Sequence, residues 1–258
     1  MTDIANPEAL AQEAMRPRAG YWKFWGTTLW LIAIIAAFMI VGIAVMGAEM
    51  VGLGIDYAEM RKALYAHGAL LLSSAIGAAV VSAFAVLALA VRLSRMGMRD
   101  YLGLVLPQRR DAMIGLAGLV LLFIVFSLIK YLSGTSLSPK FVVDLYHDAY
   151  ALGYLPAMVV ALVVLAPVTE ELLVRGFLLR GWAASRLGPT GAILLTSAIW
   201  TAAHTQYDVL ILIDVFSIGL LFGWIRQRSG STLATIILHA TQNTAALIQA
   251  AILYPAVN

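Results

Sequence analysis

The residues of this sequence best suited to chemistry are ionisable or amide side chains that lie within or beside long apolar segments. In hydrocarbon such groups are costly unless they are paired or hydrated, so each needs a partner or a function. A carboxylate, two imidazoles, an amide and a guanidinium are together suited to activating a water molecule and stabilising an oxyanion. All of these groups lie in the C-terminal half of the chain: Glu170, Glu171, Arg175, His204, His239 and Asn243.

The two adjacent glutamates are expected to have different roles. Consecutive residues of a helix project about 100° apart, so Glu170 and Glu171 cannot face the same point. Glu171 and Arg175 are four residues apart and can form an ion pair along one face. This pairing leaves Glu170 free to face a cavity. Pro167 and Thr169 precede the glutamates and predict that a helix begins there, with both carboxylates in its first turn; an ordinary acidic first turn with a helix salt bridge is the alternative.

The histidines occur at helical spacing from possible partners. Trp200 and His204 share a helix face, so the indole can pack against the imidazole, and Asp208 can hold its other ring nitrogen. His239 and Asn243 also share a face, which we expect to point into the bundle. The alternative for His204 is an interfacial residue, and for His239 and Asn243 it is a hydrogen bond between helices.

The composition indicates which elements must hold these residues. The chain has 258 residues, of which 62% are hydrophobic and 12% are charged, about half the charged share of a soluble domain. This balance excludes disordered and coiled-coil proteins and indicates a polytopic membrane protein. The sequence has no cysteine, which excludes disulfides, thiolate zinc sites and cysteine nucleophiles.

The predicted fold is an all-α polytopic transmembrane helical bundle. A membrane-spanning helix needs about 20 predominantly apolar residues, and alternating patterns typical of barrel strands are missing. Residues 167–186 could add an eighth span or continue the fourth. The seven apolar runs cover residues 26–48, 68–91, 112–132, 149–168, 189–204, 209–225 and 231–251.

The charged connections predict the orientation of the bundle. If the seven spans alternate, the basic connections fall on one side of the membrane, which the positive-inside rule places in the cytoplasm. We therefore expect a cytoplasmic N-terminus in a bacterial plasma membrane. The basic residues of these connections are Arg92, Arg95, Arg99, Arg109, Arg110, Arg180, Arg186, Arg226 and Arg228. The chain divides into a cytoplasmic lead (1–24), N-terminal membrane helices (25–148) and a catalytic membrane region (149–258).

Asp214 is a further ionisable residue between apolar neighbours. It can pair across helices or line a path to the site. We expect instead that it lies near the outer interface, where its carboxylate stays hydrated.

The ordered motifs resemble those of a known family. Glu170-Glu171-x-x-x-Arg175, an aromatic residue four positions before His204, and His239-x-x-x-Asn243 are similar to the motifs of the CPBP family of intramembrane proteases. That family includes the type II CAAX prenyl endopeptidases, and its shared region is also called the abortive-infection or lysostaphin-resistance domain. The resemblance covers residues 149–251. One departure is Trp200, where the family usually has phenylalanine.

The resemblance implies an intramembrane endopeptidase that acts on a membrane-associated peptide or protein within the lipid bilayer, with no nucleic-acid partner. Glu170 would be the general base on a water molecule that His204 positions. His239 and Asn243 would stabilise the oxyanion, and Arg175 would hold Glu171. Nothing in the sequence identifies the substrate or indicates that it is prenylated.

Metal dependence is open in the sequence. Glu170, His204 and His239 form a plausible zinc-binding set with a water molecule as the fourth ligand. The His-Glu-x-x-His motif, which carries two ligands and the base on one helix, is missing. The residue types favour zinc, and a metal-free route driven by Glu170 is the alternative.

Two non-enzymatic classes compete with the protease. A non-catalytic membrane scaffold or bacteriocin-immunity-type protein would not need the complete Glu/His/His/Asn set. A small transporter could use Glu170 and the histidines as a proton relay, but it would more naturally have paired repeats. The intact set of polar residues in one half of the chain favours an enzyme.

Overall fold

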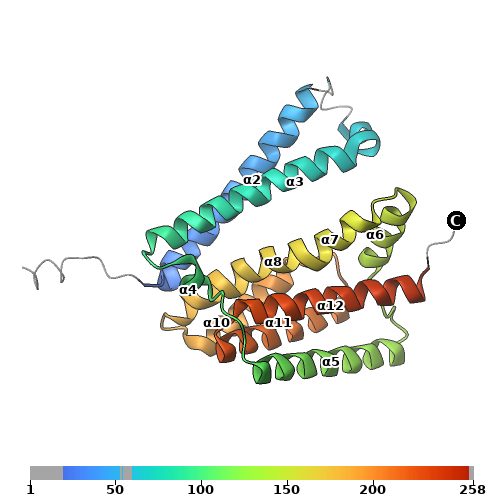
Figure 1. The fold of residues 1–258 in the computed structure, drawn as a ribbon. Coiled ribbons are helices and arrows are strands. Elements are labelled where there is room, and N and C mark those ends of the chain that lie inside the picture. The colour runs from blue at the N-terminus through green and yellow to red at the C-terminus, as the bar shows by residue number, and fades with distance from the viewer. Residues whose placement is uncertain (1–19, 53, 55–59, 256–258) are drawn as a thin grey trace, which may run out of the picture.

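The computed structural model describes residues 20–52, 54 and 60–255, and every regular element in this part is helical. The all-α prediction is therefore confirmed for the described residues, while most of the predicted lead (1–24) lies outside them. α2 (Lys23–Gly52) and α3 (Met60–Leu93) pack against each other as a hairpin that extends away from the other helices (Figure 1). The remaining elements are α4 (Met98–Leu102), α5 (Arg109–Leu132), α6 (Lys140–Ala151), α7 (Leu155–Val160), η2 (Ala161–Leu165), α8 (Ala166–Glu171), η3 (Leu172–Leu178), α9 (Leu179–Ala183), α10 (Gly188–Ala202), α11 (Val209–Ser229) and α12 (Thr232–Leu253).

Six helices of the described part are long and apolar enough to cross a membrane. They coincide with six of the seven predicted runs. The remaining run, residues 189–204, corresponds to α10, which has 15 residues, fewer than the about 20 residues that a spanning helix needs. The six helices are Lys23–Gly52, Ile76–Leu93, Arg109–Leu132, Leu155–Ala183, Val209–Ser229 and Thr232–Leu253. A count of seven or eight spans remains a prediction.

Residues Leu155–Ala183 form one continuous helical segment that contains the double-glutamate motif. The prediction that a helix begins at Pro167 is wrong, because Leu165 and Ala166 already have helical backbone angles. The Thr169 hydroxyl donates to the Ala166 carbonyl, 3.0 Å away, and does not cap a helix end. Proline lacks an N–H and clashes with the carbonyl four residues earlier, and the wider π-helical turn of η2 immediately before it accommodates this clash.

Small residues let α10 and α11 approach closely. Gly219 and Gly223 are four residues apart on α11, and both face α10. A Cβ atom at Gly219 would lie 3.0 Å from the Cβ of Ser197, and one at Gly223 would lie 3.0 Å from the Cγ2 of Ile193. Such small-residue spacing is typical of helix packing in membranes. The short α10, which ends just before His204, is thereby fixed against the longer α11.

Two ion pairs connect α5 to α11. The Lys130 ammonium donates to Asp214 over 2.9 Å, and the Arg228 guanidinium donates to Asp111 over 2.8 Å. Lys130 and Asp214 are both buried. The alternative that Asp214 pairs across helices is therefore confirmed, with a lysine 84 positions earlier in the chain as its partner. Its position near the outer interface stays a prediction.

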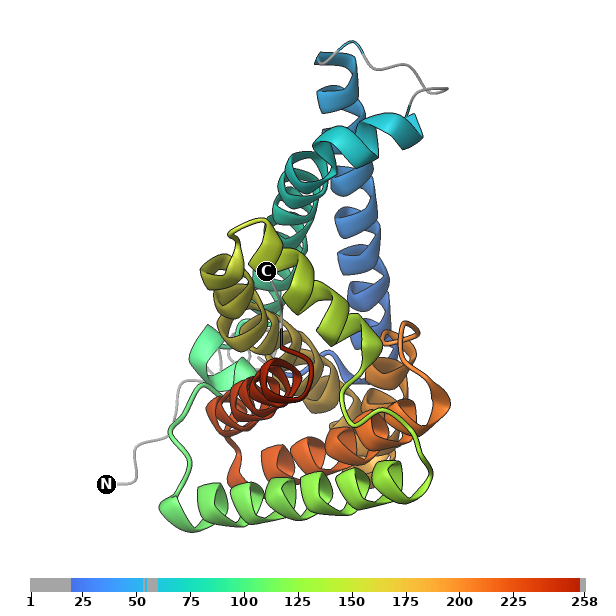
Figure 2. The same ribbon diagram turned by 90° about the vertical axis from the view of Figure 1, so that its right-hand side faces the viewer.

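α12 packs against the helix that carries the double-glutamate motif. It contacts α5, α6, η2, α8, η3 and α11, and Figure 2 shows it nearly end-on between α11 below and the α6–α7 region above. The amphipathic helix α6, most of which lies in the predicted connection before the fourth run, packs on α12. The His239 motif on α12 consequently lies beside the Glu170 motif on α8.

The Lys130–Asp214 pair predicts a non-additive pattern of stability changes. Lys130→Met leaves a buried carboxylate without its counter-charge, so we expect the free energy of unfolding to fall by about 3–5 kcal/mol. Lys130→Met combined with Asp214→Leu removes both charges and should recover most of this loss. Reversible unfolding in mixed detergent micelles measures both variants. A double variant that is less stable than the single variant would contradict the account.

Candidate active site

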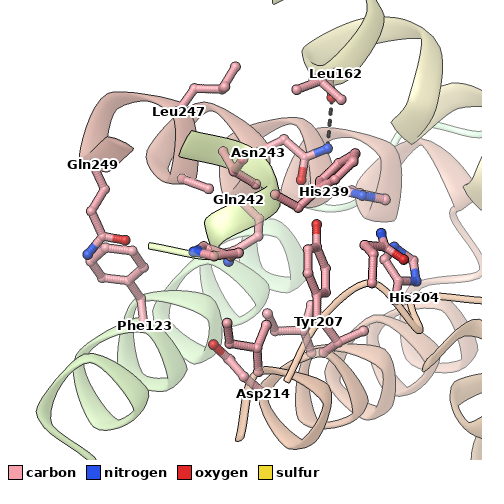
Figure 3. Close-up of a pocket in the computed structure, with 18 of the residues that line it drawn as sticks. Phe123, Leu162, His204, Tyr207, Asp214, His239, Gln242, Asn243, Leu247 and Gln249 are labelled. Carbon is pink, nitrogen blue, oxygen red and sulfur yellow. Dashed lines mark hydrogen bonds between the residues drawn. The ribbon is translucent and has the colours of Figure 1, made fainter. Parts of the chain in front are cut away.

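The predicted site residues line one cavity inside the bundle. Its volume is about 210 Å³, and its walls include Glu170, Trp200, His204, His239 and Asn243. These side chains come from α8, the end of α10 with the turn that follows it, and α12 (Figure 3). Three chain segments, whose site residues lie up to 73 positions apart, thus present their polar groups to the same cavity.

Glu171 does not face the cavity but holds its walls together. Its side chain is fully buried, and its Oε1 accepts hydrogen bonds from Arg175 over 2.7 Å and from the Nδ1 of His239 over 3.0 Å. Arg175 also donates to the Gly219 carbonyl, 3.4 Å away on α11. The predicted Glu171–Arg175 pair is therefore confirmed, and it extends to α11 and α12. Because Nδ1 of His239 donates to a carboxylate, its Nε2 is the ring atom left for the cavity.

Glu170 lies on the cavity side of the same helix. Its Oε2 accepts a hydrogen bond from the Trp200 indole over 2.6 Å, so one carboxylate oxygen is fixed and the other remains available. The Arg175 guanidinium packs over the Trp200 ring at 4.5 Å. Trp200 therefore links the two glutamates: its N–H orients Glu170, and its ring face covers the cation that pairs with Glu171.

His204 is fixed by the backbone of the preceding helix. Its Nδ1 lies 2.7 Å from the Trp200 carbonyl, which can only accept, so Nδ1 carries the hydrogen and Nε2 is left for the cavity. The ring meets Trp200 edge to face at 5.1 Å, as the helical spacing predicted. Asp208 does not hold His204: its carboxylate instead accepts from the Ile211 amide and caps α11. Asp208 is not one helical turn beyond His204, because α10 already ends at Ala202 and the chain forms a turn between His204 and Asp208.

Asn243 compensates for the proline in the neighbouring helix. Its Nδ2 donates to the Leu162 carbonyl over 2.7 Å. In the i→i−5 pattern of η2, the amide of Ala166 reaches the Ala161 carbonyl, and the next nitrogen, that of Pro167, has no hydrogen to give to Leu162. An unpaired backbone carbonyl is costly in an apolar bundle. Asn243 satisfies it and thereby joins α12 to η2.

Tyr207 is a cavity residue that sequence reasoning did not single out. Its ring stacks on His204 with centroids 5.7 Å apart, and it lines the same cavity as Glu170. Burial raises the pKa of Tyr207 above its usual value; a hydrogen bond from Gln206 offsets part of this effect, and the Glu170 charge adds to it. The sequence feature that could have indicated Tyr207 is its position three residues after His204, at the end of a predicted helix.

A second pocket lies on the other side of Glu170. Its volume is about 170 Å³, and Glu170 and Thr169 are the polar residues on its walls. The rest of its lining is apolar and comes from the α2–α3 hairpin and from Leu173: Ile34, Phe38, Val80, Ala83, Phe84, Leu87 and Leu173. Glu170 therefore stands between a polar cavity and an apolar pocket.

A family model matches the part of the chain that carries this cavity. Residues 152–245 match the family model described as type II CAAX prenyl endopeptidase Rce1-like, and this range contains every residue predicted for the site. This segment is similar to the Rce1-like family. The family resemblance inferred from the three motifs is thus confirmed, and with six apolar helices it makes the chain an integral membrane protein.

A curated relative matches part of the chain. It is a protein of Escherichia coli described as an uncharacterized 24.3 kDa protein, and it is 40% identical to this chain over 89 residues. The alignment covers 33% of this chain and 40% of that relative. No solved structure matches the chain.

The described side chains of the Rce1-like segment do not form a three-ligand metal site. Among the described residues, no three His, Cys, Asp or Glu side chains are grouped closely enough to hold a metal ion. Glu170, His204 and His239 line one cavity, but the indole of Trp200 already holds one oxygen of Glu170. The zinc set therefore stays a prediction, and no step below depends on it.

The Asn243–Leu162 hydrogen bond predicts a coupling with Pro167. Asn243→Leu should lower the free energy of unfolding by about 1–2 kcal/mol, because the Leu162 carbonyl loses its donor. In a Pro167→Ala background the new amide hydrogen can serve that carbonyl, so the same substitution should cost less. A double-mutant cycle of unfolding free energies measures the coupling. Equal losses in the two backgrounds would show that the Leu162 bond is not what Asn243 contributes.

Proposed function

We propose that this protein is an intramembrane endopeptidase that hydrolyses a peptide bond of a membrane-associated peptide or protein. The observation that carries the proposal is the convergence of Glu170, His204 and His239 on one cavity within the Rce1-like segment. A purely structural role would explain Glu171 and Arg175, which are fully buried and paired. It would not explain why a second glutamate and two imidazole nitrogens face an internal cavity.

In the proposed reaction Glu170 is the general base. Its free oxygen takes a proton from a water molecule, and the water oxygen forms a bond to the peptide carbonyl carbon. The carbonyl oxygen becomes an oxyanion. When this intermediate collapses, the carbon–nitrogen bond breaks, and the proton held by Glu170 passes to the leaving amine. The Trp200 indole N–H keeps Glu170 directed at the cavity throughout.

The histidines act on either side of this water molecule. His204 accepts a hydrogen bond from the water through Nε2, because its Nδ1–H is held by the Trp200 carbonyl. In its doubly protonated form His239 donates from Nε2 to the carbonyl oxygen, while Glu171 keeps the ring in place through Nδ1. Asn243 holds α12 against η2 beside them through one N–H, and that N–H is not available to the oxyanion.

The apolar pocket beside Glu170 suggests how the substrate lies. Its wall of α2–α3 side chains suits a hydrocarbon group, and the polar cavity on the other side suits water and the scissile bond. The family description names prenyl endopeptidases. Either an apolar side chain or a lipid group next to the cleaved bond would fit the pocket by the same chemistry.

The proposed setting is a bacterial plasma membrane with the N-terminus in the cytoplasm. The basic connections favour this orientation by the positive-inside rule. The substrate would then reach Glu170 from within the bilayer or from its cytoplasmic side.

The Glu170→Gln variant tests the proposal. Glutamine keeps the shape of the side chain and can still accept the Trp200 hydrogen bond, but it cannot take a proton from water. We expect cleavage to fall by about 10³-fold or more while the unfolding transition stays unchanged. The assay places the purified full chain in lipid vesicles with a mixture of apolar peptides of about 20 residues, and mass spectrometry identifies new termini.

Glu171→Gln is the matched control. It replaces the neighbouring carboxylate by an amide, as Glu170→Gln does. This replacement breaks the buried Glu171–Arg175 ion pair, so both stability and cleavage should fall. Wild-type cleavage by Glu170→Gln would overturn the proposal and leave the scaffold alternative. If the purified protein binds one equivalent of zinc and loses cleavage after chelation, the reaction follows the metal-dependent route and not the metal-free one.

A further inference from the structure

Tyr207 lies in the turn between α10 and α11, and its ring is held on two sides. One face stacks on the His204 imidazole, with an interplanar angle of 29°. The Phe141 ring of α6 meets it nearly edge to face, with centroids 6.2 Å apart and an interplanar angle of 66°. A ring clamped between an active-site histidine and a neighbouring helix has a fixed direction, so the position of its hydroxyl is fixed as well.

The hydroxyl of Tyr207 points into the polar cavity. Figure 3 shows the Tyr207 ring beside His204, with its oxygen directed to the side of the cavity where His239 and Asn243 lie. The Asn243 nitrogen points the other way, to the Leu162 carbonyl. The phenolic oxygen therefore lies on the side of the cavity where the proposed reaction develops negative charge.

The four site residues predicted to act on the reacting groups offer the cavity few hydrogen-bond donors, and Gln206, which also lines the cavity, donates to the Tyr207 hydroxyl and leaves its O–H free to donate. Glu170 is an acceptor, and with Nδ1–H engaged, neutral His204 and His239 each offer the cavity a lone pair at Nε2. Asn243 uses an N–H for Leu162 and turns its oxygen to the cavity. His239 becomes a donor only when it gains a second proton. A tetrahedral oxyanion requires donors, and a tyrosine hydroxyl is one in its ordinary neutral form.

We propose that Tyr207 is a catalytic residue whose hydroxyl donates a hydrogen bond to the oxyanion formed when the water activated by Glu170 adds to the peptide carbonyl. This inference rests on the proposed function. No proton is transferred from Tyr207: its O–H hydrogen bond strengthens as the carbonyl oxygen gains charge and weakens when the carbon–nitrogen bond breaks. The contribution is made in the transition state, so Tyr207 affects turnover more than substrate binding.

The test is Tyr207→Phe, which keeps both ring contacts and removes only the hydroxyl. Loss of one oxyanion donor lowers kcat by about 10²- to 10³-fold in other hydrolases, and we expect a fall of about 10²-fold here with KM unchanged. Tyr146→Phe is the matched control, because Tyr146 packs against His147 and is not part of the cavity wall. Its kcat should equal that of the wild-type protein.

A second readout separates a catalytic hydroxyl from a structural one. The peptide that the wild-type protein cleaves is synthesised with a phosphinate in place of the scissile bond, whose charged oxygens imitate the oxyanion. Its inhibition constant should rise in Tyr207→Phe by the same factor by which kcat/KM falls. A change in KM alone, or an unchanged inhibition constant, would overturn the inference.

The outcomes also distinguish this inference from the proposed function. Wild-type rates in Tyr207→Phe, with cleavage abolished in Glu170→Gln, overturn the role of Tyr207 and leave the protease. No cleavage by the wild-type protein, and no binding of the phosphinate made from any peptide of the mixture, overturn both.

Discussion

A carboxylate without access to water must be neutralised by its neighbours, and the fully buried Glu171 is such a group. Arg175 and His239 both donate to its Oε1, and Arg175 reaches on to Gly219. These contacts join the double-glutamate helix to α11 and α12, across 44 positions from Arg175 to Gly219 and 68 positions from Glu171 to His239. Because removing one partner of a buried pair costs about 3–5 kcal/mol, the arrangement has little freedom to relax. The orientation of His239, and hence the polarity of one cavity wall, depends on it.

The irregular backbone around Pro167 serves the same arrangement. The π-helical turns η2 and η3 flank α8, so the two glutamates lie on a short α-helical stretch between two wider turns. Turns of this kind are uncommon and often occur at functional sites. Here the first of them accommodates the proline, and the carbonyl that the proline cannot serve is satisfied by Asn243 of α12. Glu171 and Asn243 thus join α8 and η2 to α12 at two points.

Much of the site could be predicted because its determinants are local. The i, i+4 spacing of Glu171 and Arg175 gives their pairing, and the 100° step along a helix gives the different direction of Glu170. What depends on distant residues could not be predicted. The partner of Asp214 is 84 positions away, and the partner of Asn243 is a backbone carbonyl 81 positions away. The continuous helix through Pro167 was missed because the usual rule places proline at a helix start, and a π-helical turn is not visible in the sequence.

The tautomer of His239 tests the central claim most directly. Nitrogen-15 solid-state NMR of the labelled protein in lipid bilayers, above the pH at which imidazoles are charged, distinguishes a protonated from an unprotonated ring nitrogen. A His239→Gln sample assigns the signals. The account predicts that Nδ1 carries the hydrogen, which Glu171 accepts, and that Nε2 is unprotonated toward the cavity. A hydrogen on Nε2 with a bare Nδ1 would contradict it, because the buried carboxylate would then have lost the donor that fixes this wall of the site.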